Sequence, residues 1–355
     1  MDTPMLYRAL RAAIKARLVP IIKGPPGTGK SSIARYALAH EGYVHIKDVR
    51  AATIEAVDVS GLPYIKDGRT HYATPDMFPT TPKSAILFDD LGQATPSVMA
   101  ALSEPLLDRT VRGASNFTLP PDTVMICTAN RETDRAGVNR MLTFVNNRLL
   151  HFDHLPTVEG SMAYFNGLPP VDPATIPDLE PLQSWNSFLK SYLRARPGQF
   201  HNFDPKTSPP AFSSSRSWEM VNKLLPWIVS DDDLGLILAC SAVGDEAGGD
   251  FCVYLTHAKL LPPPQDVLAN PDSIALPEEP SMQHALLGSV VEYAPPAQAE
   301  AACKFLKRLP PDMAGAGIID LRDKGIRLKG PTGNKLYFSN PTGIRLLSES
   351  HQFMF

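Results

Sequence analysis

The segment 24–31 constrains this chain more than any other stretch, because it fits the phosphate-binding loop G-x-x-x-x-G-K-[ST] at every fixed position. In such a loop the backbone N–H groups surround phosphate oxygens, the lysine reaches the β- and γ-phosphates, and the hydroxyl can bind Mg²⁺. The sequence therefore predicts a nucleoside triphosphate as the ligand. The residues expected to contact it are Gly24, Pro25, Pro26, Gly27, Thr28, Gly29, Lys30 and Ser31, followed by Ser32.

The residues on either side of this loop support that interpretation. A phosphate-binding loop connects a strand to a helix. Residues 18–22 are apolar and partly β-branched, which favours a strand, and residues 31–39 are rich in helix formers. The loop thus has the flanking elements that phosphate binding requires.

Composition and charge are those of a soluble globular protein and do not indicate binding to nucleic acid or membranes. The chain has 355 residues, enough for two or three domains, and its 43% hydrophobic and 20% charged residues are usual for a soluble globular protein. With 34 Lys and Arg against 37 Asp and Glu, the net charge is −3, so no overall basic field indicates nucleic acid. The first residues lack a signal-peptide layout and no apolar stretch approaches about 18 residues, so we expect a cytoplasmic protein without membrane contact.

Cysteine and proline give weaker information. The four cysteines lie far apart and form no C-x-x-C pair, so neither a zinc site nor a disulfide framework is indicated. Proline is frequent, with 35 residues, and its clusters at 169–181, 262–280 and 295–296 interrupt helical patterns. We therefore expect connections between domains near these clusters.

A second motif, in residues 84–90, narrows the kind of nucleotide site. An apolar run ends in Asp89 and Asp90, the layout of a Walker B strand. A run buried in a parallel sheet would place Asp89 at the carboxyl edge of the sheet, where α/β proteins bind ligands. Asp89 is then expected to help hold Mg²⁺ through water, and Asp90 to orient or deprotonate the attacking water.

A further apolar strand, residues 123–129, ends at Asn130. This position predicts a polar amide between the two motif strands. Such an amide can hydrogen-bond the γ-phosphate or the lytic water and thereby report on the state of the nucleotide. Taken alone, an asparagine at a strand end is commonly a turn residue; after the two preceding motifs we favour the functional role.

In this order the motifs resemble those of the AAA+ ATPases, and within them the MoxR-like branch. Segments 24–31, 86–109, 123–131 and 147–149 carry the resemblance, which covers about the first 155 residues well. It implies an α/β core with a parallel five-stranded sheet, an α-helical lid and a C-terminal extension of unknown role. The implied domains are 1–155, 156–260 and 261–355.

The resemblance also implies a ring, usually a hexamer, with ATP and Mg²⁺ bound between neighbouring subunits. Arg148 matches the arginine finger, which reaches the neighbour's γ-phosphate; Arg140 and Arg131 lie near enough in sequence to share or replace that role. Arg216 matches the sensor 2 arginine at the start of a lid helix, which contacts phosphate in cis. Ser214 or Ser215 is expected to cap that helix.

Two further segments leave their meaning open. Asp67 and Gly68 between β-prone flanks predict a hairpin. The MoxR-like branch has a hairpin here that faces the ring pore or a partner, so its Tyr64, Lys66 and Arg69 either touch a substrate or only keep an exposed edge charged. Beyond residue 261 the C-terminal tail is locally basic, which indicates either a solvated face or a partner contact. The basic residues are Lys324, Arg327, Lys329, Lys335 and Arg345.

The leading hypothesis is an ATP-hydrolysing ring that remodels or activates another protein, in the manner of a chaperone. MoxR-like ATPases commonly act with a protein carrying a von Willebrand factor A domain, so the resemblance implies such a partner. A nucleic-acid motor or loader on the same core is one alternative. A scaffold that binds nucleotide but hydrolyses it little is another, because most members of the branch have Glu where this chain has the shorter Asp90.

Overall fold

The chain folds into two compact units, Met1–Leu182 with His201–Gly248 (unit 1), and Gln183–Phe200 with Gly249–Phe355 (unit 2). None of the described helices is both long enough and apolar enough to cross a membrane. The three-domain division, with limits near residues 155 and 260, stays a prediction. The computed structural model describes residues 1–111, 117–134, 139–158, 161–162, 166, 171, 186–206 and 209–324.

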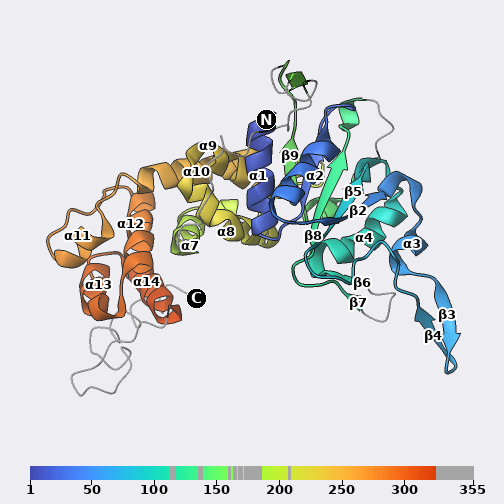
Figure 1. Ribbon diagram of the computed structural model, residues 1–355. Coiled ribbons are helices and arrows are strands. Elements are labelled where there is room, and N and C mark those ends of the chain that lie inside the picture. Colours follow the sequence, from blue (N-terminus) through green and yellow to red (C-terminus); the bar gives the residue numbers. More distant parts are fainter. Residues whose placement is uncertain are drawn as a thin grey trace. The chain divides into compact units, whose positions relative to one another are not determined.

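Unit 1 is built on a five-stranded sheet in which all neighbouring strands run parallel (Figure 1). The order β2-β5-β8-β1-β9 means that the chain leaves β1 for the edge strand β2 and returns through β5 and β8 to the side of β1. The predicted α/β fold with a parallel five-stranded sheet and helices after it is confirmed. The strands are β1 (Pro20–Lys23), β2 (His45–Arg50), β5 (Ser84–Asp89), β8 (Val124–Ala129) and β9 (Leu150–Asp153).

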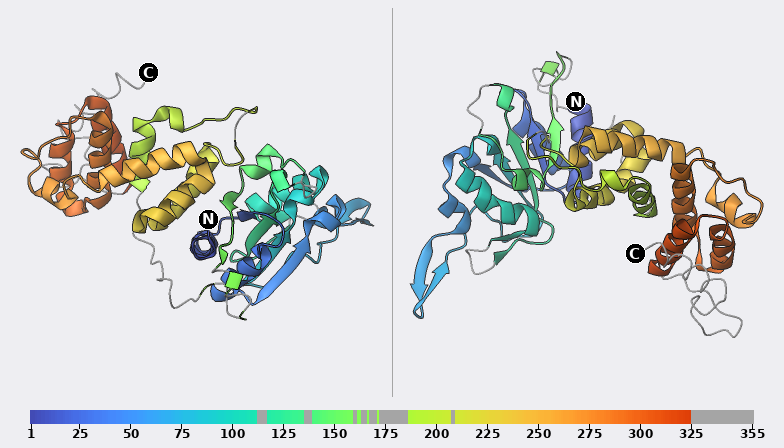
Figure 2. Two further views of the ribbon diagram at one scale, coloured as in Figure 1. Left: turned by 90° about the horizontal axis from the view of Figure 1, so that it is seen from above. Right: turned by 180° about the vertical axis from the view of Figure 1, so that it is seen from behind.

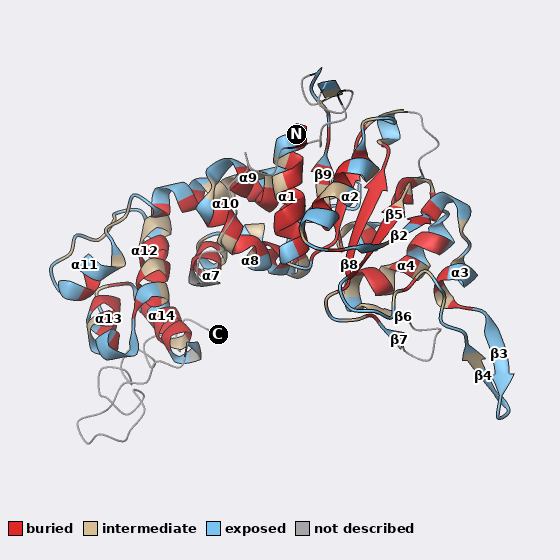
Figure 3. Ribbon diagram, in the orientation of Figure 1, coloured by how far each residue is buried: buried red, intermediate tan, exposed pale blue. Residues whose placement is uncertain are grey.

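Helices cover both faces of this sheet. On one face α2 (Lys30–His40) packs against β5 and β8, beside α1 (Thr3–Lys15). On the other, α3 (Ala56–Ser60), α4 (Pro96–Asp108) and α5 (Thr143–Asn146) close a hydrophobic core with β1, β5 and β8. The central strands β5 and β8 are buried almost throughout, whereas β2 is mostly exposed (Figure 3). Burial on both faces explains why β5 and β8 have continuous apolar sequences.

Local sequence determines where several helices begin. Asp2 and Thr95 cap α1 and α4 by accepting hydrogen bonds from backbone N–H groups three residues later, and each helix has proline in its first turn. Asp231 ends α8 (Ser215–Ser230), caps α9 (Asp232–Val243) and pairs with Arg8 of α1. Because Asp231 lies between α8 and α9, its ion pair with Arg8 links both helices to α1, against which both pack. The short elements of unit 1 are η1 (Ala51–Thr53), η2 (Leu91–Gln93), β6 (Thr110–Val111), β7 (Phe117–Thr118) and η3 (Glu132–Asp134).

The predicted hairpin is present between α3 and β5. Strands β3 (Pro63–Lys66) and β4 (Arg69–Tyr72) pair antiparallel, and the turn residues Asp67 and Gly68 have φ of 52° and 69°. Two positive φ angles are typical of the tight turn that matches strand twist. The hairpin extends away from the rest of unit 1 in each view and is mostly exposed (Figures 1, 2 and 3). Both interpretations of its side chains stay predictions.

Unit 2 is helical in its described residues. Tyr192 of α7 packs edge-on against Phe251 and Tyr254 of α10, and Arg194 makes two hydrogen bonds, of 2.6 and 3.2 Å, to Asp320 of α14. A second hydrophobic core is formed by residues of the four helices α11, α12, α13 and α14. The elements are α7 (Asn186–Ala195), η5 (Pro197–Gln199), α10 (Asp245–Ala258, which begins in unit 1), α11 (Pro264–Ala269), α12 (Pro280–Tyr293), η6 (Pro296–Gln298), α13 (Ala299–Leu306) and α14 (Pro311–Asp323).

Within residues 156–260, where the resemblance implies an α-helical lid, the described residues include the helices α7, α8, α9 and α10. The basic tail residues Arg327, Lys329, Lys335 and Arg345 lie outside the described residues, in a segment that the sequence indicates as either short strands or an extended tail.

Candidate nucleotide site

The predicted phosphate-binding loop connects β1 to α2. Gly27 and Gly29 have φ of 77° and 78°, in the left-handed region, and a Cβ on either would meet nothing within 4 Å. The backbone conformation, and not crowding, therefore requires glycine at these positions. Thr28 Oγ1 donates to the carbonyl of Pro25 at 2.9 Å, which closes the loop. Pro26 and Ser32 are exposed beside it, Ser32 in the first turn of α2, where free N–H groups favour an anion.

Gly24 is required for another reason: the backbone of His154 approaches it too closely to leave room for a side chain. A Cβ on Gly24 would lie 2.5 Å from the carbonyl oxygen of His154, which directly follows β9. The His154 N–H in turn donates to the carbonyl of Lys23 at 2.7 Å. Burial lowers the pKa of the His154 imidazole, and hydrogen bonds to the backbone of Met1 and Thr28 oppose that shift.

The Gly24→Ala substitution is expected to destabilise the fold by about 1–3 kcal/mol, because the added methyl group must displace the His154 backbone. Thermal unfolding would measure this as a lower melting temperature, together with weaker nucleotide binding. Gly249→Ala is the matched control: Gly249 lies within α10, where a Cβ would meet nothing within 4 Å. Equal melting temperatures of the two variants would contradict the close-approach argument.

Lys30 is the centre of the polar contacts in the loop. It is 7% exposed, and its ammonium donates to the carbonyls of Gly24 and Pro25 at 3.0 and 2.8 Å and to Asn130 Oδ1 at 3.0 Å. An ammonium has three N–H donors, so all are in use and a phosphate oxygen has to replace one of these acceptors. Burial lowers the pKa of Lys30, and the nearby carboxylates of Asp90 and Asp89 oppose that shift.

Asp89 and Asp90 lie at the carboxyl edge of β5, as predicted. Ser31 Oγ donates to Asp89 Oδ1 at 2.7 Å, and Thr128 of β8 donates to the same oxygen. Asp90 is half-buried, with φ 56° and ψ 39°, and its N–H donates to Thr128 Oγ1 at 3.2 Å. Both acids are thus held close to the first turn of α2.

The oxygens of Ser31 and Asp89 suit Mg²⁺, a hard cation that proteins hold through one or two carboxylates and substrate phosphates. Ser31 Oγ can offer a lone pair to a metal while its O–H continues to donate to Asp89 Oδ1. The described residues contain no cluster of three or more His, Cys, Asp or Glu that could hold a metal by itself. The donor set therefore fits an ion that arrives with a triphosphate.

Asn130 lies at the end of β8, which the strand order places between β5 and β1. It is 9% exposed, and its Oδ1 accepts the hydrogen bond from Lys30. The predicted position between the two motif strands therefore agrees with the structure.

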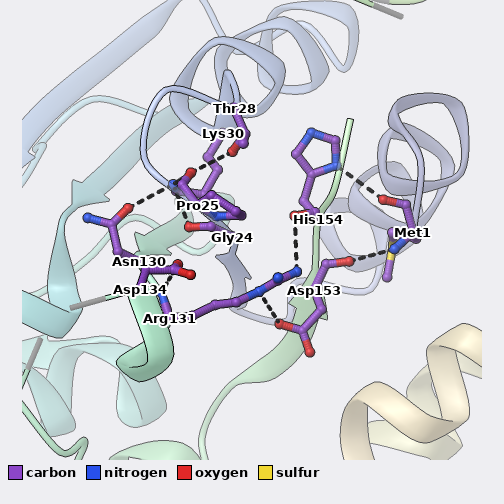
Figure 4. A network of polar contacts seen from close by, with 10 residues as sticks. All are labelled: Met1, Gly24, Pro25, Thr28, Lys30, Asn130, Arg131, Asp134, Asp153 and His154. Carbon is purple, nitrogen blue, oxygen red and sulfur yellow. Dashed lines mark hydrogen bonds and ion pairs between the residues drawn. The ribbon is translucent and has the colours of Figure 1, made fainter. Parts of the chain in front are cut away.

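Arg131 follows Asn130 and links it to β9 (Figure 4). Its N–H donates to Asp134 Oδ2 at 3.0 Å, and its guanidinium lies 3.8 Å from Asp153 Oδ1 and 3.4 Å from the carbonyl oxygen of His154. These contacts connect the strand that carries Asn130 to the residue that packs on Gly24.

A cleft of about 640 Å³ opens beside Asn130 within unit 1. Burial lowers the pKa of Lys23 in its lining, against the charges of Asp153 and Glu132. Arg131 and Arg140, two of the three candidates for the arginine finger, line this cleft together with Asn130 of their own chain. The lining includes Lys23, Asn130, Arg131, Arg140, Phe203 and Phe212.

Arg148 occupies a different place, beside Arg216. Its guanidinium donates to the carbonyl of Phe144 at 2.5 Å. Burial and the positive charge of Arg216 lower the pKa of Arg148, and Asp108 opposes them. Ser214, which caps α8, donates to Asn147 Oδ1 at 2.8 Å, so the start of α8 lies on the residue before Arg148. The predicted cis contact of Arg216 with phosphate stays a prediction.

Sequence reasoning missed two residues that contribute to the site, Thr128 and His154. The signal for Thr128 was a hydroxyl inside an apolar strand, two residues before Asn130.

The structure therefore places the predicted residues in two groups. One group comprises Gly24, Pro25, Thr28, Lys30, Ser31, Asp89, Asp90 and Asn130, and the other Arg148 and Arg216.

Comparisons with known proteins add little to this geometry. No protein-family model matches the chain, and no curated protein matches it. Among solved structures, the crystal structure of a "putative ATPase" from Cytophaga hutchinsonii covers 68% of this chain and 80% of its own, with 14% sequence identity and a TM-score of 0.46.

Proposed function

We propose that the protein binds and hydrolyses ATP. The contact that carries this proposal is that of Lys30 with Gly24, Pro25 and Asn130, which holds a buried ammonium between the loop and the strand next to Walker B. A cation held there exchanges one of these acceptors for a phosphate oxygen, and such positioned positive charge is the chief means of catalysing phosphoryl transfer.

Mg²⁺ is proposed as the cofactor, held by Ser31 directly and by Asp89 through water. When bound, Mg²⁺ neutralises charge that develops between the β- and γ-phosphates. Ser31 and Asp89 would hold the ion, and Asn130, whose Oδ1 accepts from Lys30, would donate from its amide N–H to the γ-phosphate.

Asp90 is proposed to accept the proton of the attacking water. Asp90→Asn is therefore expected to lower the rate of hydrolysis by about 10²–10⁴-fold with ATP binding retained, because an amide cannot take up that proton. Phosphate release at saturating ATP and binding of a fluorescent ATP analogue would measure the two effects. Asp90→Glu, which moves the carboxylate one methylene further out, should raise the rate. Wild-type turnover in Asp90→Asn would remove Asp90 from catalysis.

The second group, Arg148 and Arg216, supports a site completed by a neighbouring subunit. Burial and the charge of Arg216 both disfavour the charged form of Arg148, and a bound anion would offset them. We propose that both reach the γ-phosphate bound by the next copy, in a closed ring that we take from the AAA+ resemblance to be a hexamer. The cis role that the resemblance implies for Arg216 is the alternative.

The remodelling role is proposed from the MoxR-like resemblance, with a protein carrying a von Willebrand factor A domain as partner. Phosphate release by purified protein with Mg²⁺ and ATP tests the activity. If no phosphate is released at any concentration that forms rings, the scaffold interpretation holds. Strong stimulation by DNA or RNA would instead favour the nucleic-acid motor.

A further inference from the structure

Thr128 contacts both acids of the Walker B strand. Its hydroxyl donates to Asp89 Oδ1 and accepts from the N–H of Asp90 at 3.2 Å. The side chain is fully buried in β8, next to β5. A hydroxyl has one donor and two acceptor lone pairs, so both hydrogen bonds form at once.

These two hydrogen bonds hold the geometry that hydrolysis needs. Asp89 Oδ1 receives Thr128 and Ser31 together, which fixes the rotation of the carboxylate; among the described residues no hydrogen bond uses Oδ2. Asp90 has a left-handed backbone, uncommon outside glycine, and the bond from its N–H to Thr128 supports that bend. The direction in which both carboxylates leave the sheet edge therefore depends on one hydroxyl.

The place of Thr128 also couples the acids to the loop. Asn130 lies two residues after Thr128, directly behind the end of β8, and accepts from Lys30. The end of β8 therefore contacts both the loop lysine and the two acids. A shift of β8 would move these contacts together, whereas separate strands could move independently.

We propose that Thr128 is a positioning residue for hydrolysis: it directs Asp89 Oδ2 toward the water shell of the metal and sets the backbone from which Asp90 reaches the attacking water. This inference rests on the proposed ATPase function. Thr128 touches neither nucleotide nor metal in this role, and acts through Asp89 and Asp90.

The test compares Thr128→Val, which removes the hydroxyl at nearly constant volume, with Thr128→Ser, which keeps it. Thr128→Val is expected to lower kcat at least about tenfold, as loss of a partner of a metal ligand commonly does, and to raise the Mg²⁺ concentration needed for half the maximal rate. The KM for ATP should change much less, because the loop is intact. Thr128→Ser should retain most of the activity. If the valine variant does not fold, Thr128→Ala carries the same expectation.

Thr123→Val is the matched control. Thr123 directly precedes β8, is 1% exposed, and its hydroxyl has no hydrogen-bond partner among the described residues. Removing that hydroxyl should leave kcat, KM and the Mg²⁺ dependence at wild-type values.

The outcomes separate this inference from the proposed function. If wild type hydrolyses ATP and folded Thr128→Val does so equally well, with the same Mg²⁺ dependence, the positioning role is overturned; equal losses in the serine and valine variants overturn it too. If wild type releases no phosphate, the ATPase proposal fails. The positioning role is then tested by the Mg²⁺ concentration that gives half-maximal binding of a fluorescent ATP analogue. If this concentration is the same in Thr128→Val as in wild type, or if wild type does not bind the analogue, the role is overturned.

Discussion

The Lys30→Ala protein is expected to lose ATP hydrolysis by about 10³-fold and to bind ATP more weakly. The lysine supplies the positive charge for the phosphates, and its removal leaves the carbonyls of Gly24 and Pro25 and the Oδ1 of Asn130 without their donor. Those oxygens would then face phosphate oxygens of like charge. Phosphate release at saturating ATP and titration with a fluorescent ATP analogue measure both losses.

Lys83→Ala is the control for this experiment, because it removes the same charge at the other end of the sheet. Lys83 directly precedes β5 and lies over the Tyr43 ring at 4.5 Å. Its replacement should leave hydrolysis unchanged. Wild-type turnover in Lys30→Ala would mean that the protein hydrolyses ATP at a site other than this loop.

The first group of site residues could be predicted from the sequence because each position follows from a local pattern. Gly29 and Lys30 are fixed positions of the loop motif, Asp89 ends one buried strand, and Asn130 follows another. Parallel strands bring their carboxyl ends to one edge, so local patterns suffice to assemble them.

The second group could not be predicted in this way. The start of α8 lies near Arg148 because Ser214, which caps α8, donates to Asn147, and because α8 packs on α1, where Asp231 pairs with Arg8. These contacts join residues far apart in the chain, and no periodicity encodes them. The close approach of Gly24 to His154 is hidden for the same reason.

Arg148→Ala is expected to reduce hydrolysis by about 10³-fold or more while ATP binding stays near wild type, because an arginine finger stabilises charge that develops only in the transition state. Arg216→Ala should follow the same pattern if the two side chains act together. Arg140→Ala, which changes a cation lining the cleft beside Asn130, should have a much smaller effect. Phosphate release and analogue binding, measured on each variant at ring-forming concentration, would test this order.

Mixing two inactive variants decides whether Arg148 acts on the neighbouring subunit. Arg148→Ala keeps Asp90, and Asp90→Asn keeps the finger, so in a mixed ring about one quarter of the interfaces join an intact Asp90 to an intact Arg148 across a head-to-tail contact. Activity should therefore return to a comparable fraction of wild type on mixing. A finger that acted within its own subunit would leave every site incomplete, and mixing would recover nothing. Arg216→Ala mixed with Asp90→Asn distinguishes the trans role of Arg216 from the cis role in the same way, because only a trans contact is restored by the neighbour.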